Sequence, residues 1–266
     1  MRWCYLLFFC LSQSFAATGE FSLLLQGIQT RSSLHPRNVY LYLPHGYESR
    51  GNLRYPVLYM HDGQNLYDPA RSTYGETWKV TETLNHLIAQ KLIPPIIVVG
   101  IDNTSERMAE YTHDREASRP QGGKAHSYLE FITYDLKPYI DHVFATRPEA
   151  SSTGIMGSSL GGLVSLYAGA MFSETFGLIG AMSPSVWWNN KSILSIILHS
   201  PKPERIYLDS GTGSGERPAD AELAARVFTQ SGGRNIMIEI QQGATHNEKY
   251  WALRLPKALR FLFARK

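Results

Sequence analysis

Cysteine is nearly absent from this chain of 266 residues, and the two that occur, Cys4 and Cys10, both lie near its start. The remainder of the chain therefore offers no disulfide, no thiolate metal site and no cysteine nucleophile. If the chain is exported without its first residues, as argued below, its stability must come from a hydrophobic core alone.

Concentrated charge is also lacking. The formal net charge is +3, and no dense run of Lys or Arg occurs, so nothing indicates a nucleic-acid partner. The hydrophobic fraction of 43% is ordinary for a globular protein and argues against disorder or several membrane spans. Internal repeats and a convincing domain boundary are missing too, so we expect a single large domain.

The start of the chain has the pattern of a secretory signal peptide. Met1-Arg2 precedes an apolar run from Trp3 to Leu11, and small residues follow up to Ala17. A charged start, a short apolar segment and a small-residue exit are typical of such a peptide, and the run is too short to span a bilayer. We therefore expect a signal peptide over 1–17 and one domain over 18–266.

This assignment predicts a periplasmic or secreted protein without a stable membrane anchor. A lipoprotein anchored through Cys10 is less favoured, because the bulky Phe9 stands where a small residue is expected.

Strand-like and helix-like segments alternate along the rest of the chain. The expected strands are 21–30, 38–43, 55–60, 96–101, 153–157, 176–182, 205–209 and 235–240. The expected helices are 77–91, 127–144, 160–171, 219–230 and 248–264. This alternation predicts an α/β fold with a mostly parallel sheet, helices on both faces, and ligands bound beyond the carboxyl ends of the strands.

Gly157, Ser159 and Gly161 form the pattern G-x-S-x-G between an expected strand and an expected helix. In that setting the serine lies on a strained turn with its hydroxyl exposed, and glycines avoid collisions between strand and helix. Ser159 is thus the candidate nucleophile, and the amide of Leu160 faces a developing oxyanion. The alternative is a small-residue turn without chemistry.

A serine nucleophile needs a histidine base and an acid that orients it. His246 lies in the loop before the last helix, as the order Ser, acid, His requires. The acid is left open between Asp209, at a strand end, and Glu216, in the glycine-rich loop that follows. Asp220 is a third option, although a helix cap is the more usual role for it.

Two further segments face the same predicted edge of the sheet. The turn at Gly63-Gln64 follows the third strand, so the Gln64 amide is the expected second oxyanion donor. Trp187 and Trp188 follow a later strand and could stack on a flat acyl group, or simply pack beneath a loop. Neighbouring His61 and Asp62 invite a metal interpretation, but no further ligand cluster is present, so we expect no metal.

Several motifs together carry a resemblance to a known family. They are Tyr40 to Tyr47, Leu58 to Asn65, Gly100 to Asn103 with Arg107 and Glu110, Met156 to Gly162, Ser183 to Ser185 with Trp188, and Thr245 to Glu248. Over nearly the whole mature length the chain resembles the putative-esterase branch of the α/β-hydrolases. That branch contains feruloyl and acetyl-xylan esterases, S-formylglutathione hydrolases, mycolyltransferases and enterobactin-type siderophore esterases.

The resemblance implies an α/β-hydrolase fold and a serine carboxylic-ester hydrolase that works through an acyl-enzyme, without a cofactor, on a small-molecule ester. The family's G-x-x-[DE] loop matches residues 213–216 and favours Glu216, although some siderophore esterases work with a Ser/His pair. Asp62, Arg107 and Ser158 join Trp187 and Trp188 as the expected substrate-binding residues.

The substrate itself stays open. The chain looks most like the siderophore-esterase subgroup, and an anionic catecholate could bind basic residues of the long connection 102–126. These are Arg107, His113, Arg115, Arg119 and Lys124, which could equally be a solvated loop. A feruloyl, acetyl-carbohydrate or general short-acyl esterase is the main alternative. A noncatalytic binder on a hydrolase scaffold and an acyltransferase are further possibilities, and the oligomeric state is not indicated.

Overall fold

The computed structural model describes residues 19–49, 51–116, 118 and 121–264. The expected signal peptide lies outside the described residues. Within them, no helix is both long enough and apolar enough to cross a membrane.

An eight-stranded sheet runs through the centre of the protein. Its strands are β1 (Phe21–Ile28), β2 (Arg37–Tyr42), β3 (Val57–Met60), β4 (Ile97–Ile101), β5 (Thr153–Ser158), β6 (Leu178–Met182), β7 (Arg205–Gly211) and β8 (Ile236–Gln241). They are ordered β1-β2-β4-β3-β5-β6-β7-β8. β1 and β2 pair antiparallel, β2 is also antiparallel to β4, and the remaining pairs are parallel. The predicted α/β-hydrolase fold is confirmed.

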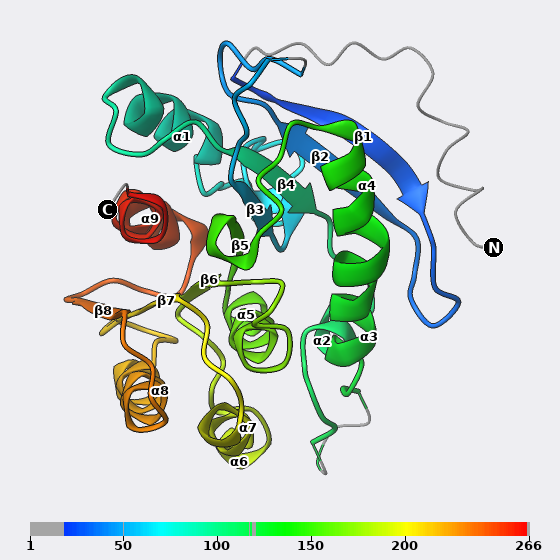
Figure 1. The fold of residues 1–266 in the computed structure, drawn as a ribbon. Coiled ribbons are helices and arrows are strands. Elements are labelled where there is room, and N and C mark those ends of the chain that lie inside the picture. Colours follow the sequence, from blue (N-terminus) through cyan, green and yellow to red (C-terminus); the bar gives the residue numbers. More distant parts are fainter. Residues whose placement is uncertain (1–18, 50, 117, 119–120, 265–266) are drawn as a thin grey trace.

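Helices cover both faces of the sheet (Figure 1). On one face lie α1 (Val80–Ala89) and α9 (Glu248–Phe263), which contact each other. The opposite face is covered by α3 (Ala125–Glu130), the π-helical turn η3 (Phe131–Leu136), α4 (Lys137–Val143), α5 (Leu160–Met171), α7 (Ile193–His199) and α8 (Pro218–Gln230). The shorter elements are η2 (Gly63–Asn65), α2 (Arg107–Glu110), η4 (Ala150–Ser152) and α6 (Trp188–Lys191).

The core divides into two clusters, one on each side of the sheet. Trp78 and Trp251 meet in the smaller cluster, with ring centroids 5.9 Å apart, and join the segment before α1 to α9. α5 is buried almost all round because it packs between the sheet, α3 and α7. Such a helix holds the turn that precedes it firmly in place.

The expected helix over 127–144 is divided in the structure into α3, a π-helical turn and α4. α2, α6 and α7 were not predicted. For α7 a weak signal existed, since Ile193 and Ile197 are spaced four apart and both are buried.

The parallel strands bring the predicted site segments to one edge of the sheet. In register, Met60 pairs with Met156, Ser158 with Met182, and Met182 with Asp209. The segments that follow β3, β5, β6 and β7 therefore leave the sheet at similar heights, as the carboxyl-edge rule expects.

Candidate active site

Ser159 occupies a strained turn between β5 and α5. Its φ of 58° and ψ of −121° fall in a region that side-chain-bearing residues rarely adopt. Hydrogen bonds hold it there: Ser159 N donates to Met182 O at 3.0 Å, and Ser185 N donates to Ser159 O at 3.0 Å. The Ser159 and Ser185 hydroxyl oxygens lie 3.3 Å apart.

The two glycines of the motif differ in how tightly they are packed. A Cβ on Gly157 would lie 2.8 Å from the carbonyl carbon of Gly161 and 2.9 Å from the His61 ring. A Cβ on Gly161 would lie 3.4 Å from Asp62 Oδ2, which is an ordinary contact distance. The prediction that a side chain would collide at both glycines is therefore confirmed for Gly157 and wrong for Gly161.

Ser159 and His246 line the same cavity, which has a volume of about 570 Å³. It opens beyond the carboxyl ends of β3 and β5, beside the N-terminus of α9. Its other lining residues are Asp62, Asn65, Thr73, Tyr74, Glu76, Asn103, Thr104, Arg107, Ser158, Asn247, Glu248 and Trp251.

Glu216 contacts the histidine. Its Oε2 lies 3.5 Å from His246 Nδ1, and the edge of the imidazole packs against Trp251 at a centroid distance of 5.0 Å. Ser210 Oγ donates to Glu216 Oε2 at 3.0 Å, and Ser183 Oγ donates to Oε1 at 2.8 Å.

These contacts affect the ionisation of the Glu216 carboxyl. Burial alone would raise its pKa, but the hydrogen bonds from His246, Ser183 and Ser210 outweigh burial and hold the pKa below its usual value. Glu216 is therefore ionised at neutral pH beside the imidazole, as an orienting acid must be.

Asp209 lies beneath this pair and has different partners. It is fully buried at the end of β7, where Ser183 N donates to Oδ1 at 3.0 Å and Arg254 Nε lies 3.0 Å from Oδ2. Arg254 also approaches Glu216 at 3.5 Å. Burial raises the pKa of Asp209 to about 6 despite Arg254. These contacts favour a supporting position for Asp209.

Asp220, the third acid considered, lies in the first turn of α8. Its carboxylate forms an ion pair of 2.6 Å with Lys191, and the N-cap position belongs to Arg217. A carboxylate in the first turn is favourable to the helix dipole, so Asp220 has a structural explanation.

Asp62 and Arg107 form a bidentate ion pair at the wall of the cavity. Arg107 Nε donates to Oδ1 at 2.7 Å and Nη2 donates to Oδ2 at 2.8 Å, while Asn103 Nδ2 donates to Oδ1 at 2.5 Å. Burial would raise the pKa of Asp62, but the Arg107 charge and these hydrogen bonds hold it below its usual value. Asp62 is thereby fixed in the left-handed conformation, with φ at 56°.

The two expected oxyanion donors lie at or near the start of helical segments. Leu160 is the first residue of α5, and Gln64 lies in η2, immediately beyond Asp62. Gln64 Oε1 accepts a hydrogen bond of 3.1 Å from Asn103 N, which connects η2 to the loop after β4. A Cβ on Gly63 would lie 2.9 Å from Asp102 N, so only glycine fits at this crossing.

His61 is buried and has a structural environment. Its Nδ1 lies 2.9 Å from the Tyr128 hydroxyl, and its Nε2 has no hydrogen-bond partner among the described residues. Burial lowers its pKa to about 3. In the part of the chain that the structure describes, no three His, Cys, Asp or Glu side chains are grouped in a way that could hold a metal ion.

Trp187 and Trp188, which were expected to stack on an acyl group, lie outside the lining of the cavity. Trp188 is completely buried, and its indole nitrogen donates to Asp114 O at 3.1 Å. Trp187 is half-buried near Arg217, whose guanidinium carbon lies 5.8 Å from the ring centroid. Neither residue is among those that line the cavity, and packing beneath the loop, the alternative interpretation, describes Trp188.

Among the described basic residues of the long connection, only Arg107 lines the cavity. His113 stacks on Tyr167 and its Nε2 lies 2.8 Å from Ser192 Oγ, whereas Lys124 pairs with Glu106 at 3.1 Å. Arg115 is exposed and forms an isolated bridge with Gly122. Arg119 lies outside the described residues. The described members of the expected basic set, Arg107 apart, therefore lie away from the cavity at Ser159.

Several lining residues were missed by the sequence analysis. Glu248 and Trp251 follow His246 on the first turns of α9, a placement that the Thr245 to Glu248 motif could have suggested. The segment 73–76 gave no signal, because it reaches the cavity only through the tertiary fold.

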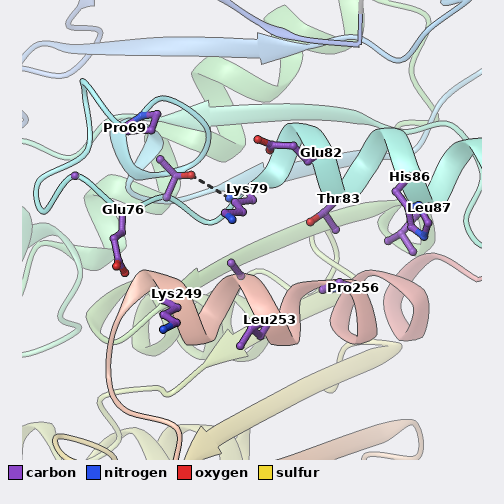
Figure 2. Close-up of a pocket in the computed structure, with 13 residues that line it drawn as sticks. Pro69, Glu76, Lys79, Glu82, Thr83, His86, Leu87, Lys249, Leu253 and Pro256 are labelled. Atoms are coloured by element: carbon purple, nitrogen blue, oxygen red, sulfur yellow. Dashed lines mark hydrogen bonds between the residues drawn. The ribbon is translucent and has the colours of Figure 1, made fainter.

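A second hollow of about 670 Å³ lies between α1 and α9 and shares Glu76 with the cavity at Ser159. Figure 2 shows Lys79 and Glu82 on the α1 side, and Lys249, Leu253 and Pro256 along α9.

Comparison with known proteins shows the family of this chain. Residues 31–262 match the family described as "Putative esterase". The chain belongs to this family. It is accordingly a serine-type carboxylic ester hydrolase, as predicted.

The esterase resembles proteins of several organisms. It is 27% identical to the protein YbbA of Bacillus subtilis, over 86% of this chain and 93% of the relative. It is 26% identical to the siderophore enterobactin esterase of Emericella nidulans, over 52% of this chain and 49% of that enzyme. The match thus spans only about half of the Emericella enzyme.

A solved structure shares the fold. The IroE-like serine hydrolase of Shewanella oneidensis superposes with a TM-score of 0.71 at 21% identity, covering 92% of this chain and 80% of the other.

Proposed function

We propose that Ser159, His246 and Glu216 are the nucleophile, base and acid of this esterase. The observation that carries the proposal is that Ser159 and His246 line one cavity while Glu216 contacts the imidazole from behind. The strained conformation of Ser159 supports it, because such strain is typical of a nucleophile on a strand-to-helix turn.

The roles follow from the geometry. Ionised Glu216 accepts a hydrogen bond from Nδ1–H of His246 and thereby keeps the proton on Nδ1. Nε2 is then unprotonated and accepts the Ser159 proton as Oγ attacks the ester carbonyl. His246 then gives that proton to the leaving alcohol, and an acyl-enzyme forms. Water enters, His246 takes its proton, and the tetrahedral intermediate collapses to release the acid and Ser159.

The amides of Gln64 and Leu160 are the proposed donors to the oxyanion. Leu160 begins α5, where amide groups have no partner within the helix and the helix dipole is positive. The ion pair of Asp62 with Arg107 supports a fixed position for the neighbouring turn that carries Gln64.

For the substrate we propose a small-molecule ester that fits the cavity of about 570 Å³. The similarity to the Emericella enterobactin esterase supports a siderophore-type ester. A feruloyl, acetyl-carbohydrate or short-acyl ester is the alternative, and the wide cavity lined by polar side chains is compatible with it. Asp62, Arg107 and Ser158 are proposed to contact the substrate.

We also propose that residues 1–17 direct export and are removed, with 18–266 as the mature esterase domain in the periplasm or medium. Expression of the full chain followed by mass spectrometry of the exported product tests this. A new N-terminus near Ala16 or Ala17 is expected, and an intact N-terminus would refute the proposal.

A fluorophosphonate probe tests the catalytic roles without a guess about the substrate. The purified protein is labelled and mapped by mass spectrometry, with Ser159→Ala and His246→Ala in parallel. We expect one adduct on Ser159, no adduct in Ser159→Ala, and strongly slowed labelling in His246→Ala.

An adduct elsewhere, or none, would contradict the assignment and favour a noncatalytic binder on this scaffold. Adding alcohols as acceptors and measuring ester products then distinguishes an acyltransferase from a hydrolase.

A further inference from the structure

The cavity at Ser159 is lined by three carboxylates and one permanent cation. The carboxylates belong to Asp62, Glu76 and Glu248, and the cation is Arg107. They come from four segments far apart in the sequence, so this charge pattern exists only in the folded protein.

The cation, Arg107, is already paired with one of these carboxylates. Nε and Nη2 of Arg107 both donate to the Asp62 carboxylate, at 2.7 and 2.8 Å, and the side chain is 30% exposed. A guanidinium engaged edge-on by one carboxylate is largely neutralised toward a third group. Asp62 and Arg107 thus cancel, and Glu76 and Glu248 set the net charge of the cavity.

Glu248 is a buried carboxylate with two other carboxylates, Asp62 and Glu76, among the charged groups that act on it. Only 5% of the residue is exposed, and Oε1 accepts a hydrogen bond of 3.2 Å from Asn65 Nδ2. The Glu248 backbone amide also donates a hydrogen bond to this carboxylate. Burial, with the nearby charges of Asp62 and Glu76, raises the pKa of Glu248. A positive group in the cavity would relieve this unfavourable environment.

Glu76 is exposed at the rim, on the boundary between the cavity and the hollow between α1 and α9. Two lysines, Lys79 and Lys249, line that neighbouring hollow and do not line the cavity. Both lysines are exposed, so water and salt screen their charges within about 10 Å at ordinary salt.

We infer that Glu248 and Glu76 make this esterase select substrates by charge. Esters that carry an ammonium group near the scissile bond are cleaved in preference to neutral ones, and anionic esters are disfavoured. The inference rests on the proposed function of Ser159 and His246. Between the two substrate classes proposed above, the inference therefore disfavours a siderophore-type ester that carries ionised catecholates and favours the neutral alternatives. The reason is that the residues lining the cavity include no arginine or lysine other than the paired Arg107.

Three butyrate esters of similar size test it. Their alcohols are 2-(trimethylammonio)ethanol, 3,3-dimethylbutanol and 2-sulfoethanol, which are cationic, neutral and anionic. Hydrolysis is followed by pH-stat at pH 7.5 and low salt. We expect kcat/KM to fall in that order by about tenfold per step, and the differences to shrink in 0.5 M NaCl.

Glu248→Gln and Glu76→Gln are each expected to reduce the cation-to-anion ratio by about threefold to tenfold. Glu82→Gln is the matched control, because Glu82 is an exposed carboxylate of the neighbouring hollow that does not line the cavity. This control should leave the ratio unchanged. If Glu248→Gln fails to fold, the exposed Glu76 decides the question alone.

Equal rates for the three esters, faster cleavage of the anionic ester, or an equal effect of Glu82→Gln would each overturn the inference. Loss of the proposed function has a different signature, since even the neutral ester would then not be cleaved. The two failures are therefore distinguishable.

Discussion

His246 Nδ1 and Glu216 Oε2 lie 3.5 Å apart, although the two residues come from different loops, after β8 and after β7. Asp209, which lies in β7 itself, contacts Arg254 and the Ser183 amide instead. This arrangement separates an orienting acid from a buried supporting acid.

Replacement of Glu216 by Gln is expected to lower kcat by about a hundredfold to ten-thousandfold, because the amide no longer holds Nδ1 protonated. Asp209→Asn should instead lower the stability by about 1–3 kcal/mol, since it disturbs buried contacts. Steady-state kinetics and urea unfolding of both variants check this. The reverse pattern would assign the acid to Asp209, and full activity in both would indicate a Ser/His pair.

Arg107→Met should lower kcat/KM by about tenfold to a hundredfold, because Asp62 loses the partner that fixes the turn before Gln64. The control is Arg71→Met. It breaks an ion pair in which Arg71 Nη2 donates to both carboxylate oxygens of Asp102, and Arg71 does not line the cavity. Kinetics with a neutral ester, together with thermal unfolding, distinguish the effects. Equal losses in both variants would show a general effect on stability.

The buried His61 is expected to make stability depend on pH. Its folded pKa of about 3 is below its ordinary value of 6.5, so the unfolded chain binds the extra proton between these values. The contribution of neutral His61 to the free energy of unfolding is therefore fully present above about pH 6.5, and it is lost as the pH falls toward 3.

Between pH 7 and pH 5 the wild type should lose about 2 kcal/mol more than His61→Gln. Urea unfolding at the two pH values measures this. Comparing the two proteins removes the contribution of Asp209, whose pKa of about 6 makes stability fall as pH rises. Parallel pH dependence in the two proteins would contradict the assignment.

The two glycines of the serine motif should respond differently to alanine. Gly157→Ala is expected to destabilise the fold by about 3 kcal/mol or more, because its Cβ would meet backbone atoms at 2.8 Å. Gly161→Ala should stay within about 1 kcal/mol of the wild type, because alanine favours the helix and the Cβ makes ordinary contacts. Thermal unfolding decides, and equal losses would refute the distinction.

Much of the fold was predictable because its signals are local. Each of the eight strands lies within or close to its expected range, because buried parallel strands are short apolar runs. The longer helices were found because their apolar residues recur at helical spacing. Ser159 was recognisable because a strained turn needs small neighbours, and His246 because chain order places the base in the last loop.

The other parts of the site depend on contacts between distant segments. Asp209 and Glu216 both follow the same strand, and only the packing of α9, which brings Arg254 against Asp209, shows which of them reaches the histidine. Likewise Trp188 turned inward toward Asp114, a contact that no local pattern encodes.

The sequence by itself determined the strands, the longer helices α1, α5, α8 and α9, and the turn that carries Ser159, because these follow from periodicity and from steric limits within a few residues. The tertiary structure alone decided how charge is distributed around that serine. Arg107 is neutralised by Asp62, and Glu248 is buried beside the cavity, because side chains from separate segments compete for the same partners in a region with little water.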